Sequence, residues 1–374
     1  MKIPLIRPNP PRLSRLGEAL AAIEASGLFS NYGPVNTRFE QAMAASVFGG
    51  VGGCVTACNA TVALMLAIRH AIGERPEGRR YALMPSFTFA ATAHAALWCG
   101  LTPLLCDIDE RTWVPSLAAE DALLEQFGPQ IAVLVPYATF GNDLDLARYS
   151  ALSRRYGIPL VVDAAASLGT VSADGAAFGT GCPHPVVFSL HATKAFATLE
   201  AGLTYCADPA VVAALRAMGN FGFSEPRTAT MPGLNAKLSE VTALMGLEKL
   251  AEFEQVIAHR AAIAAAYRAE LPGWTFQHLT GQRHAFTFMP VLLPAQCAPR
   301  RAAVIEALAA EGIGAGCYFS PHLAEQPYFR TTCRAGDLAA TDRIARRMIT
   351  LPMSDAMTEA EAGYVCRVLR NVCG

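Results

Sequence analysis

From residue 54 to residue 207 the chain alternates between short apolar runs and longer segments with helical periodicity. Such alternation is typical of βαβ units, in which buried strands are joined by helices. The expected strands are Cys54–Ala57, Tyr81–Met84, Thr102–Asp107, Ile131–Val135, Pro159–Val162, Val186–Phe188 and Ala201–Ala207. The expected helices run through His70 and over Ala90–Cys99, Leu117–Phe127, Leu144–Tyr156 and Asp208–Met218. The pattern predicts an α/β domain whose mostly parallel sheet is covered by helices on both faces.

Residues with useful chemistry follow several of these strands. Ligands of such sheets bind beyond the carboxyl ends of the strands, where Thr61, Phe89, Asp163 and Lys194 would all lie. Thr61 stands at the start of a helix, and the free N–H groups there, together with its hydroxyl, suit a phosphate. An ordinary helix start, capped by Asn59 or by Thr61 itself, is the alternative interpretation.

Lys194 closes a polar loop after the strand Val186–Phe188. A lysine beyond a buried strand is costly unless it is paired or takes part in chemistry. Its amine can form a Schiff base with the aldehyde of pyridoxal phosphate, and Asp163 could keep the pyridine nitrogen of that cofactor protonated. The alternatives are a solvated loop lysine and a helix N-cap at Asp163 before Ala164.

The composition limits the class of protein. A formal net charge of −1 favours neither nucleic acid nor an anionic membrane as a partner. The 11 cysteines include no CxxC pair, so we expect no metal site, no disulfide framework, and reduced thiols in the cytoplasm. The N-terminus shows no signal peptide. The long apolar run Phe87–Cys106 contains Gly100 and Pro103, which predicts a helix followed by a strand rather than a membrane span.

The remaining chain predicts a second, smaller domain. Helices are expected over residues 12–27 and Val35–Phe48 at the start, and an irregular stretch over residues 219–234. Leu238–Tyr267 is expected to form one long helix or two. The elements expected after it are strands near Phe286–Leu293 and Gly316–Phe319 and helices near Arg300–Glu311 and Ala339–Met348. We predict a large domain over residues 1–250 and a smaller α+β domain over residues 251–374.

Short motifs occur along the chain in a characteristic order. They are Tyr32–Pro34 with Phe39–Glu40, Asn59–Thr61 with Ala63–Leu64, Pro85 with Thr88–Thr92, Pro103 with Asp107–Asp109, Phe140–Gly141, Asp163–Ala165, Phe188–Ser189 with His191 and Thr193–Lys194, Glu200 with Gly202, Gly233 with Asn235 and Glu240, Tyr318 with Pro321–His322, and Leu351–Pro352. Taken together, they make the chain resemble, nearly end to end, the DegT/DnrJ/StrS family of sugar aminotransferases. These enzymes use pyridoxal phosphate and have the aspartate-aminotransferase fold.

The resemblance implies a role for each matching position of the cofactor site. Lys194 would be the Schiff-base lysine, and Asp163 would be the partner of the pyridine nitrogen. Phe89 would be the aromatic residue that stacks on the cofactor ring. The residues that would cradle the phosphate are Ala60, Thr61 and Ser189.

Further positions concern a partner subunit and the substrate. Asn235 matches an asparagine that family members contribute to the phosphate from the neighbouring subunit, which implies a homodimer with shared active sites. Tyr318 and His322 match a segment on the substrate side, although a buried structural Tyr or His is the alternative. Ala166 departs from the family pattern, which has a glutamine there that bonds the ring hydroxyl of the cofactor. Ser167 or a water could take its place. A further departure is the apolar segment Ala195–Ala197 after the lysine.

The function implied by the resemblance is transfer of an amino group from an amino acid, with glutamate expected, to a keto-sugar linked to a nucleotide diphosphate. This places the protein in amino- and deoxysugar biosynthesis. Freed Lys194 would move the proton, which requires that its pKa be lowered by burial and by the cationic ring system. Because of the departures near Ala166 and Ala195, an acceptor such as a cyclitol or a related ketone stays open. A sensor that binds the cofactor without turnover is the second alternative.

Overall fold

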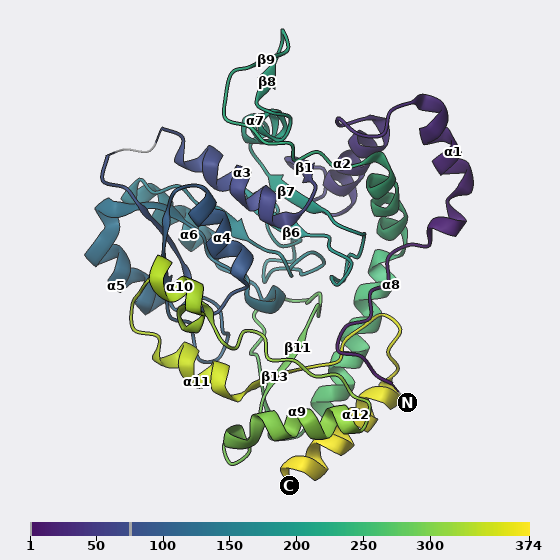
Figure 1. Ribbon diagram of the computed structural model, residues 1–374, viewed down its shortest axis with the longest axis vertical. Helices are drawn as coiled ribbons and strands as arrows, with labels where there is room; N and C mark the ends of the chain where they lie inside the picture. Colours follow the sequence, from purple (N-terminus) through teal and green to yellow (C-terminus); the bar gives the residue numbers. More distant parts are fainter. Residues whose placement is uncertain (1, 75–76) are drawn as a thin grey trace.

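The computed structural model describes residues 2–74 and 77–374 and has a mixed α/β fold (Figure 1). Its central sheet consists of two hydrogen-bonded groups of strands. The first has the order β1 (Gly53–Ala57), β7 (Gly202–Cys206), β6 (Val186–Ser189), β5 (Val162–Asp163); the second has the order β12 (Arg334–Ala335), β3 (Thr102–Cys106), β2 (Tyr81–Pro85), β4 (Ile131–Leu134). Parallel bridges from Leu134 to Leu160 and from Tyr137 to Asp163 join the groups into one sheet.

The sheet is mostly parallel, as predicted, and β7 is its antiparallel member. β7 runs antiparallel to both β1 and β6, whereas β5 is parallel to β6, and β2 is parallel to β3 and β4. The loop of residues 190–201 carries the chain from β6 directly back into β7, and adjacent strands joined without a crossover are antiparallel. This loop contains Lys194 and leaves it at the carboxyl end of β6.

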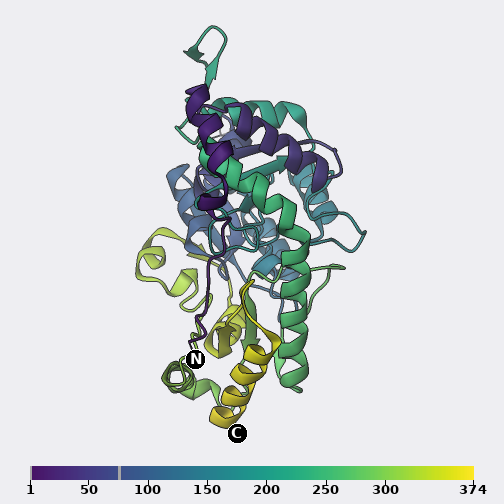
Figure 2. The same cartoon turned by 90° about the vertical axis from the view of Figure 1, so that its right-hand side faces the viewer.

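Helices cover both faces of the sheet (Figures 1 and 2). On one face the core includes residues of α2 (Pro34–Ser46), α5 (Leu117–Phe127), α6 (Leu146–Tyr156) and α8 (Glu240–Glu270). The core of the other face includes residues of α3 (Ala60–Ile72), α4 (Ala90–Trp98) and α7 (Pro209–Gly219). Because both faces are buried, the middle strands are mostly apolar, which is why they stand out in the sequence as short apolar runs.

The C-terminal part has a core of its own. Its sheet places β11 (Met289–Leu292) between β10 (Thr275–Phe276) and β13 (Met348–Leu351), with both pairs antiparallel. The helices that belong to it are α9 (Arg301–Ala310), α12 (Glu359–Cys373) and the second half of α8, whereas α10 (Pro327–Thr332) and α11 (Ala339–Arg347) lie against the large sheet and the aromatic cluster beside it. Ile3, near the other end of the chain, belongs to this core and pairs with Ile313. Both termini therefore lie at the same end of the molecule (Figure 1).

The predicted domain boundary at residue 250 lies inside α8, which is one uninterrupted helix of 31 residues; the division into two domains stays a prediction. The strand expected over Gly316–Phe319 is wrong. Gly316 makes a single bridge to Thr350, and the chain then turns, because the N–H of Ser320 donates to the carbonyl of Cys317.

The N-terminal helix is also shorter than predicted. Residues 12–27 divide into a 3-10 turn and α1 (Gly17–Ser26), since Leu16 leaves helical geometry in front of a glycine with poor helix propensity. The stretch of residues 219–234 is not wholly irregular: it includes the short hairpin β8 (Phe223–Ser224) and β9 (Thr228–Ala229), which projects from the body (Figures 1 and 2).

The prediction about the long apolar run is confirmed. Phe87–Cys106 folds as α4 followed by β3. In the part of the chain that the structure describes, no helix is both long and apolar enough to cross a membrane. The cysteines are free thiols, and many of them are buried.

Candidate functional site

Lys194 lies in a closed turn between β6 and β7. Backbone hydrogen bonds from Leu190 to Ala201 and from Ala192 to Leu199 continue the pairing of the two strands into the loop. The N–H of Lys194 then donates to the carbonyl of His191 at 2.8 Å, so the backbone at the lysine is held. Its Nζ lies 5.1 Å from the centre of the Phe288 ring. The loop thus directs the amine towards an aromatic surface.

The surroundings of this amine weaken its charged form. Desolvation lowers the pKa of Lys194 to about 8, while the charge of Asp163 opposes the shift. Amines with a lowered pKa are neutral, and therefore nucleophilic, in a larger fraction of molecules near neutral pH. The interpretation of Lys194 as a solvated loop lysine is not supported.

Asp163 ends β5 and is nearly completely buried. Its Oδ1 accepts a hydrogen bond from the N–H of Ala165 at 3.1 Å, and its Oδ2 accepts one from the hydroxyl of Thr92 at 2.6 Å. Burial raises the pKa of Asp163, and these two bonds and the charge of Lys194 oppose the rise. No helix starts after it, because residues 164–169 form turns, so the N-cap interpretation is wrong.

The start of α3 forms a small polar cradle. Asn59 is the N-cap, and its side chain accepts from the N–H of Val62 at 2.9 Å. The amides of Ala60 and Thr61 have no acceptor among the described residues, as expected for the first turn of a helix. Gly202 of β7 lies so close that a Cβ there would be 2.6 Å from the carbonyl oxygen of Asn59. Because Gly202 also pairs with Ser189, the strand ends and the helix start meet in one place.

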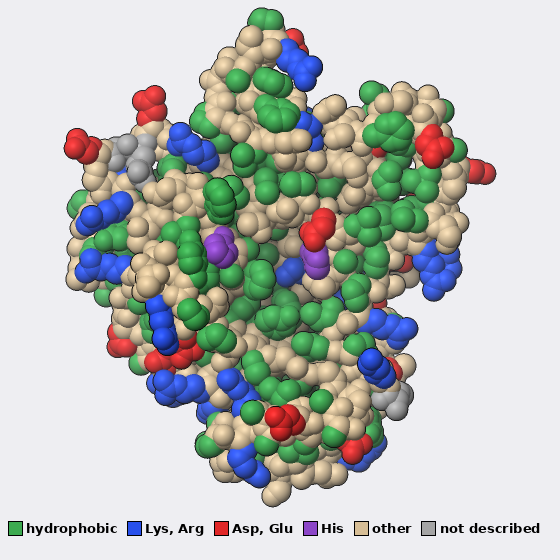
Figure 3. Space-filling model, viewed as in Figure 1, with side chains coloured by type: hydrophobic (Ala, Val, Ile, Leu, Met, Phe, Trp, Pro, Cys, Tyr) green, Lys and Arg blue, Asp and Glu red, His purple; other side chains and the backbone are tan. Residues whose placement is uncertain are grey.

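Phe89 occupies the N-cap position of α4, with extended backbone geometry and 58% of its side chain exposed. A large exposed aromatic ring is available for stacking. Figure 3 shows hydrophobic side chains gathered around a hollow in the middle of the face that Figure 1 presents. The structure therefore brings four of the predicted elements, namely the strand ends of Asp163 and Ser189, the start of α3 and the loop of Lys194, to one edge of the sheet.

The remaining predicted residues lie around this centre in different ways. Asn235 is exposed and pairs through its backbone with Asn220. Its side chain has no hydrogen-bond partner among residues 2–74 and 77–374, so a contact with a neighbouring subunit stays a prediction. Tyr318 packs edge-on against Phe288, with ring centres 5.3 Å apart. Since Phe288 also lies beside the amine of Lys194, Tyr318 borders the same space.

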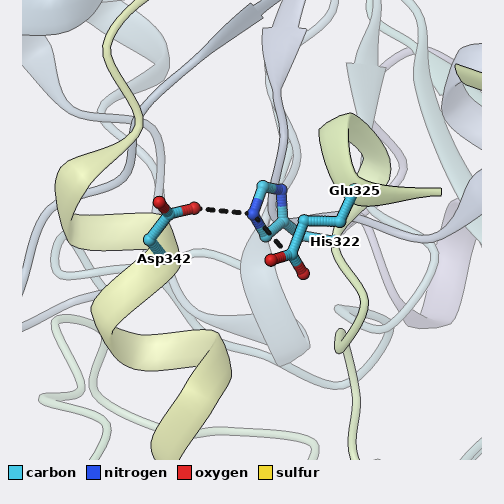
Figure 4. A group of neighbouring side chains, drawn as sticks. All are labelled: His322, Glu325 and Asp342. Atoms are coloured by element: carbon cyan, nitrogen blue, oxygen red, sulfur yellow. Dashed lines mark hydrogen bonds and ion pairs between the residues drawn. The ribbon is translucent and has the colours of Figure 1, made fainter. Parts of the chain in front are cut away.

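His322 lies behind this surface, with only 1% of its area exposed. Its Nε2 is 2.9 Å from Asp342 and 3.8 Å from Glu325 (Figure 4). Its Nδ1 lies 2.8 Å from the hydroxyl oxygen of Ser86. Both ring nitrogens are then engaged.

Among the described residues, His322, Glu325 and Asp342 are the group whose ligand atoms lie close enough together to hold a cation. In the structure both ring nitrogens have polar partners within the protein. The expectation of no metal stays a prediction.

Three contributors to the site had no role in the sequence interpretation. They are Thr92, which bonds Asp163; Phe288, which borders Lys194; and Ser86, which bonds His322. Thr92 stands four residues after Thr88 at the start of a helix, a spacing that places both hydroxyls on one side. That spacing was the available signal for Thr92. Phe288 offered none, since it lies just before β11, far along the chain.

The residues fit pyridoxal phosphate. The cradle of unpaired amides, the glycine that allows close approach, and the amine and carboxylate at one edge match the needs of a phosphate, an aldehyde and a pyridine nitrogen. The Ala166 methyl offers no hydrogen bond to the ring hydroxyl. The neighbouring Ser167 hydroxyl is buried and has no partner among the described residues, so a polar group is free in this segment.

The model of the DegT/DnrJ/EryC1/StrS aminotransferase family matches residues 14–370. The chain belongs to this family. It is an aminotransferase that depends on pyridoxal phosphate, and the predictions of fold, cofactor and enzyme class are confirmed.

Relatives and solved structures agree with this membership. The chain is 34% identical to Protein Rv3402c of Mycobacterium tuberculosis H37Rv, over 99% of this chain and 90% of the relative. A Bacillus cereus structure assigned as a PLP-dependent aminotransferase has a TM-score of 0.93 and 35% identity, covering 99% of this chain and 100% of the other. DesI, solved in the presence of its TDP-sugar product, has a TM-score of 0.89 and 33% identity, covering 100% and 93%.

Proposed function

We propose that this aminotransferase moves an amino group from an amino acid, with glutamate as the expected donor, to a keto-sugar carried by a nucleotide diphosphate. The observation that carries the transfer chemistry is that the Lys194 amine, whose pKa is lowered to about 8, lies within the electrostatic influence of the buried carboxylate of Asp163. The acceptor class is supported by the similarity to DesI, whose product is a TDP-sugar.

Each residue would have a distinct task. The bound cofactor would supply the electron sink for amino transfer. Asp163 would keep a proton at the ring nitrogen. Each of its oxygens accepts one hydrogen bond, from Thr92 or from Ala165, and keeps a further lone pair that could accept the proton of the ring nitrogen. Lys194 would hold the cofactor through Nζ and, once displaced, would carry a proton between substrate and cofactor carbons. A neutral amine is required for that step, and desolvation favours it.

The cradle and the aromatic residues would fix the cofactor. The amides of Ala60 and Thr61 and the hydroxyl of Ser189 would bind the phosphate, while Phe89 would cover one face of the ring. Asn235 would complete the cradle from a second copy of the chain, so the active form would be a homodimer. Its exposed, unpaired side chain supports this proposal.

The substrate side would be bordered by Tyr318. Its ring packs on Phe288 next to the amine, so its hydroxyl would be within reach of a bound sugar. His322 would act from behind, because both of its nitrogens are engaged with Ser86 and Asp342. We therefore place His322 in support of the loop of residues 318–326 rather than in direct contact with the sugar.

The test is an absorption spectrum of the protein with added pyridoxal phosphate, before and after glutamate. The expected result is a visible band of the lysine-bound cofactor that falls on addition of glutamate, while a near-ultraviolet band of the aminated cofactor rises. Absence of any visible band would contradict the proposal.

Two further outcomes separate the alternatives. Keto-sugar nucleotides and keto-cyclitols, tested side by side with the glutamate-treated protein, should show that the visible band returns with the sugar nucleotides. Return with cyclitols alone would favour the second acceptor class. A visible band that no amino donor changes would favour a sensor.

A further inference from the structure

A chain of two buried hydroxyls, from Thr88 just before α4 and Thr92 in its first turn, ends on Asp163. The Oγ1 of Thr88 lies 2.9 Å from the Oγ1 of Thr92, and the latter lies 2.6 Å from Oδ2 of Asp163. All three side chains are almost fully buried. Water does not reach this chain, so the protein alone determines the hydrogen bonds of the carboxylate.

The direction of the chain follows from the chemistry of its end. An ionised carboxylate only accepts, so the hydroxyl of Thr92 donates to Asp163. The oxygen of Thr92 is then free to accept the hydroxyl of Thr88. The other oxygen of Asp163 is held by the N–H of Ala165. The carboxylate is thus fixed at both oxygens, from α4 and from its own turn.

The same helix turn carries Phe89. The backbone N–H of Thr92 donates to the carbonyl of Phe89 at 3.3 Å, and Phe89 is the N-cap residue of α4. One turn of helix therefore places both the ring available for stacking and the hydroxyl that holds Asp163. Movement of this turn would change both at once.

We propose that Thr92 is a positioning residue for Asp163: its hydroxyl holds the carboxylate in the orientation and charge state that the ring nitrogen of the cofactor requires, and Thr88 orients that hydroxyl. The contact between Thr92 and Asp163 stands on the geometry alone. Its consequence for the cofactor rests on the proposed function.

The charge of Asp163 depends on few neighbours. Burial favours the protonated carboxyl and raises its pKa, whereas Thr92, Ala165 and the ammonium of Lys194 favour the ionised form. Tyr137, on the neighbouring strand end, is buried as well, and its own pKa is raised by burial and by the charge of Asp163. Removal of the hydroxyl of Thr92 should therefore raise the pKa of Asp163 further.

Thr92→Val removes this hydroxyl while nearly keeping the shape of the side chain, and Thr92→Ser keeps the hydroxyl. The matched control is Thr170→Val, because Thr170 is equally buried and its hydroxyl donates to the backbone carbonyl of Gly141 instead of a carboxylate. The first readout uses protein without cofactor: the midpoint of thermal unfolding, measured from mildly acidic to mildly alkaline pH.

A carboxyl with a raised folded-state pKa destabilises the fold progressively as pH rises from its unfolded-state pKa to its folded-state pKa. The deficit of Thr92→Val relative to the native protein should therefore grow with pH. The deficit of Thr170→Val should stay constant, and Thr92→Ser should follow the native protein. A deficit of Thr92→Val that does not change with pH would overturn the proposal, as would a Thr92→Ser variant that behaves like Thr92→Val.

The second readout is the affinity for pyridoxal phosphate. Loss of a hydrogen bond to a charged group should weaken binding by about 10- to 100-fold in Thr92→Val, with native affinity in Thr92→Ser. Native affinity in Thr92→Val would overturn the role towards the cofactor. If the native protein itself binds no pyridoxal phosphate, the proposed function fails, whereas the pH dependence without cofactor still decides the contact between Thr92 and Asp163.

Discussion

The protein contains two lysines whose amines are desolvated, and the two amines are held in opposite ways. Lys249 of α8 is completely buried, and its Nζ contacts Glu252 at 2.8 Å, the carbonyl oxygen of Asn9 at 3.1 Å and Asp355 at 3.4 Å. Lys194 keeps part of its side chain exposed, and its Nζ has the Phe288 ring and the charge of Asp163 but no hydrogen bond among the described residues. Both amines have lost water. Among the described residues, only the amine of Lys249 has gained hydrogen-bond partners in its place.

The difference teaches that compensation decides the chemistry of a buried amine. The amine of Lys249 has three oxygen partners, and Asp355 also contacts Arg260 at 2.6 Å, so these groups form a network. An amine that loses water without gaining such partners has a lowered pKa and becomes a nucleophile. Lys249 joins segments of the chain, and Lys194 is available for reaction.

The largest effect should come from Lys194→Ala. Loss of both the covalent link to the cofactor and the group that carries the proton should lower kcat by on the order of 10⁴-fold or more. The measurement is the glutamate half-reaction, together with the visible band of the lysine-bound cofactor, which should disappear. Turnover of Lys194→Ala close to that of the native protein would show that Lys194 is not the reactive amine.

Lys249→Met should instead affect stability. Removal of one partner from a buried ionic network leaves the carboxylate of Asp355 with less compensation, and the expected cost is about 3–5 kcal/mol in the free energy of unfolding. Urea unfolding measures this value, and activity per folded molecule should remain. A selective loss of activity in a stable Lys249→Met protein would show that Lys249 takes part in the reaction and does not only stabilise the fold.

The pH dependence of stability should distinguish the two lysines directly. The folded-state pKa of Lys194 is about 8, below the ordinary value of 10.5, so the unfolded chain binds more protons between these values. The contribution of Lys194 to stability without cofactor, taken as the difference between the native protein and Lys194→Met, should therefore rise with pH across that window. The same difference taken with Lys249→Met should show no such rise. A difference for Lys194→Met that does not change with pH would mean that the pKa of Lys194 is not lowered.

The smallest effect should come from Glu252→Gln. Glu252 contacts Lys249 but is 48% exposed, and an ion pair with a solvated partner contributes only about 0.2–1 kcal/mol. Asp355→Asn, at a partner only 5% exposed, should cost several times more. Equal losses in the two variants, compared by urea unfolding, would mean that burial of the carboxylate does not set the strength of this network.

Much of the site was predictable because its signals are local. Lys194 and Asp163 each follow an apolar strand, and the carboxyl ends of parallel strands meet at one edge of a sheet, so strand positions alone bring them together. The cradle at Ala60 and Thr61 needed only a strand, a tight turn and a helix start. These features depend on neighbours in sequence, which periodicity and turn chemistry describe well.

The network around Lys249 depends on contacts that are distant in sequence. Asn9 is 240 residues away from the lysine and Asp355 is 106 residues away. No spacing rule connects them, and a lysine in a long helix is most often solvated. Phe288 and the hydroxyl of Ser86 became parts of the site through tertiary packing in the same way. The turn after Gly316 was missed because an apolar run with an aromatic pair looks like a strand until its backbone partners are known.

The pairing of Ile3 with Ile313 means that the C-terminal core can form only after the large sheet has been synthesised. A ribosome delivers Ile3 first, yet the strand and helices that cover it come from the last quarter of the chain. The large sheet is available to fold before them, with Lys194 already in its loop. Phe288 and Tyr318 are synthesised after this sheet, so the amine of Lys194 gains the Phe288 ring beside it only when the C-terminal core has formed.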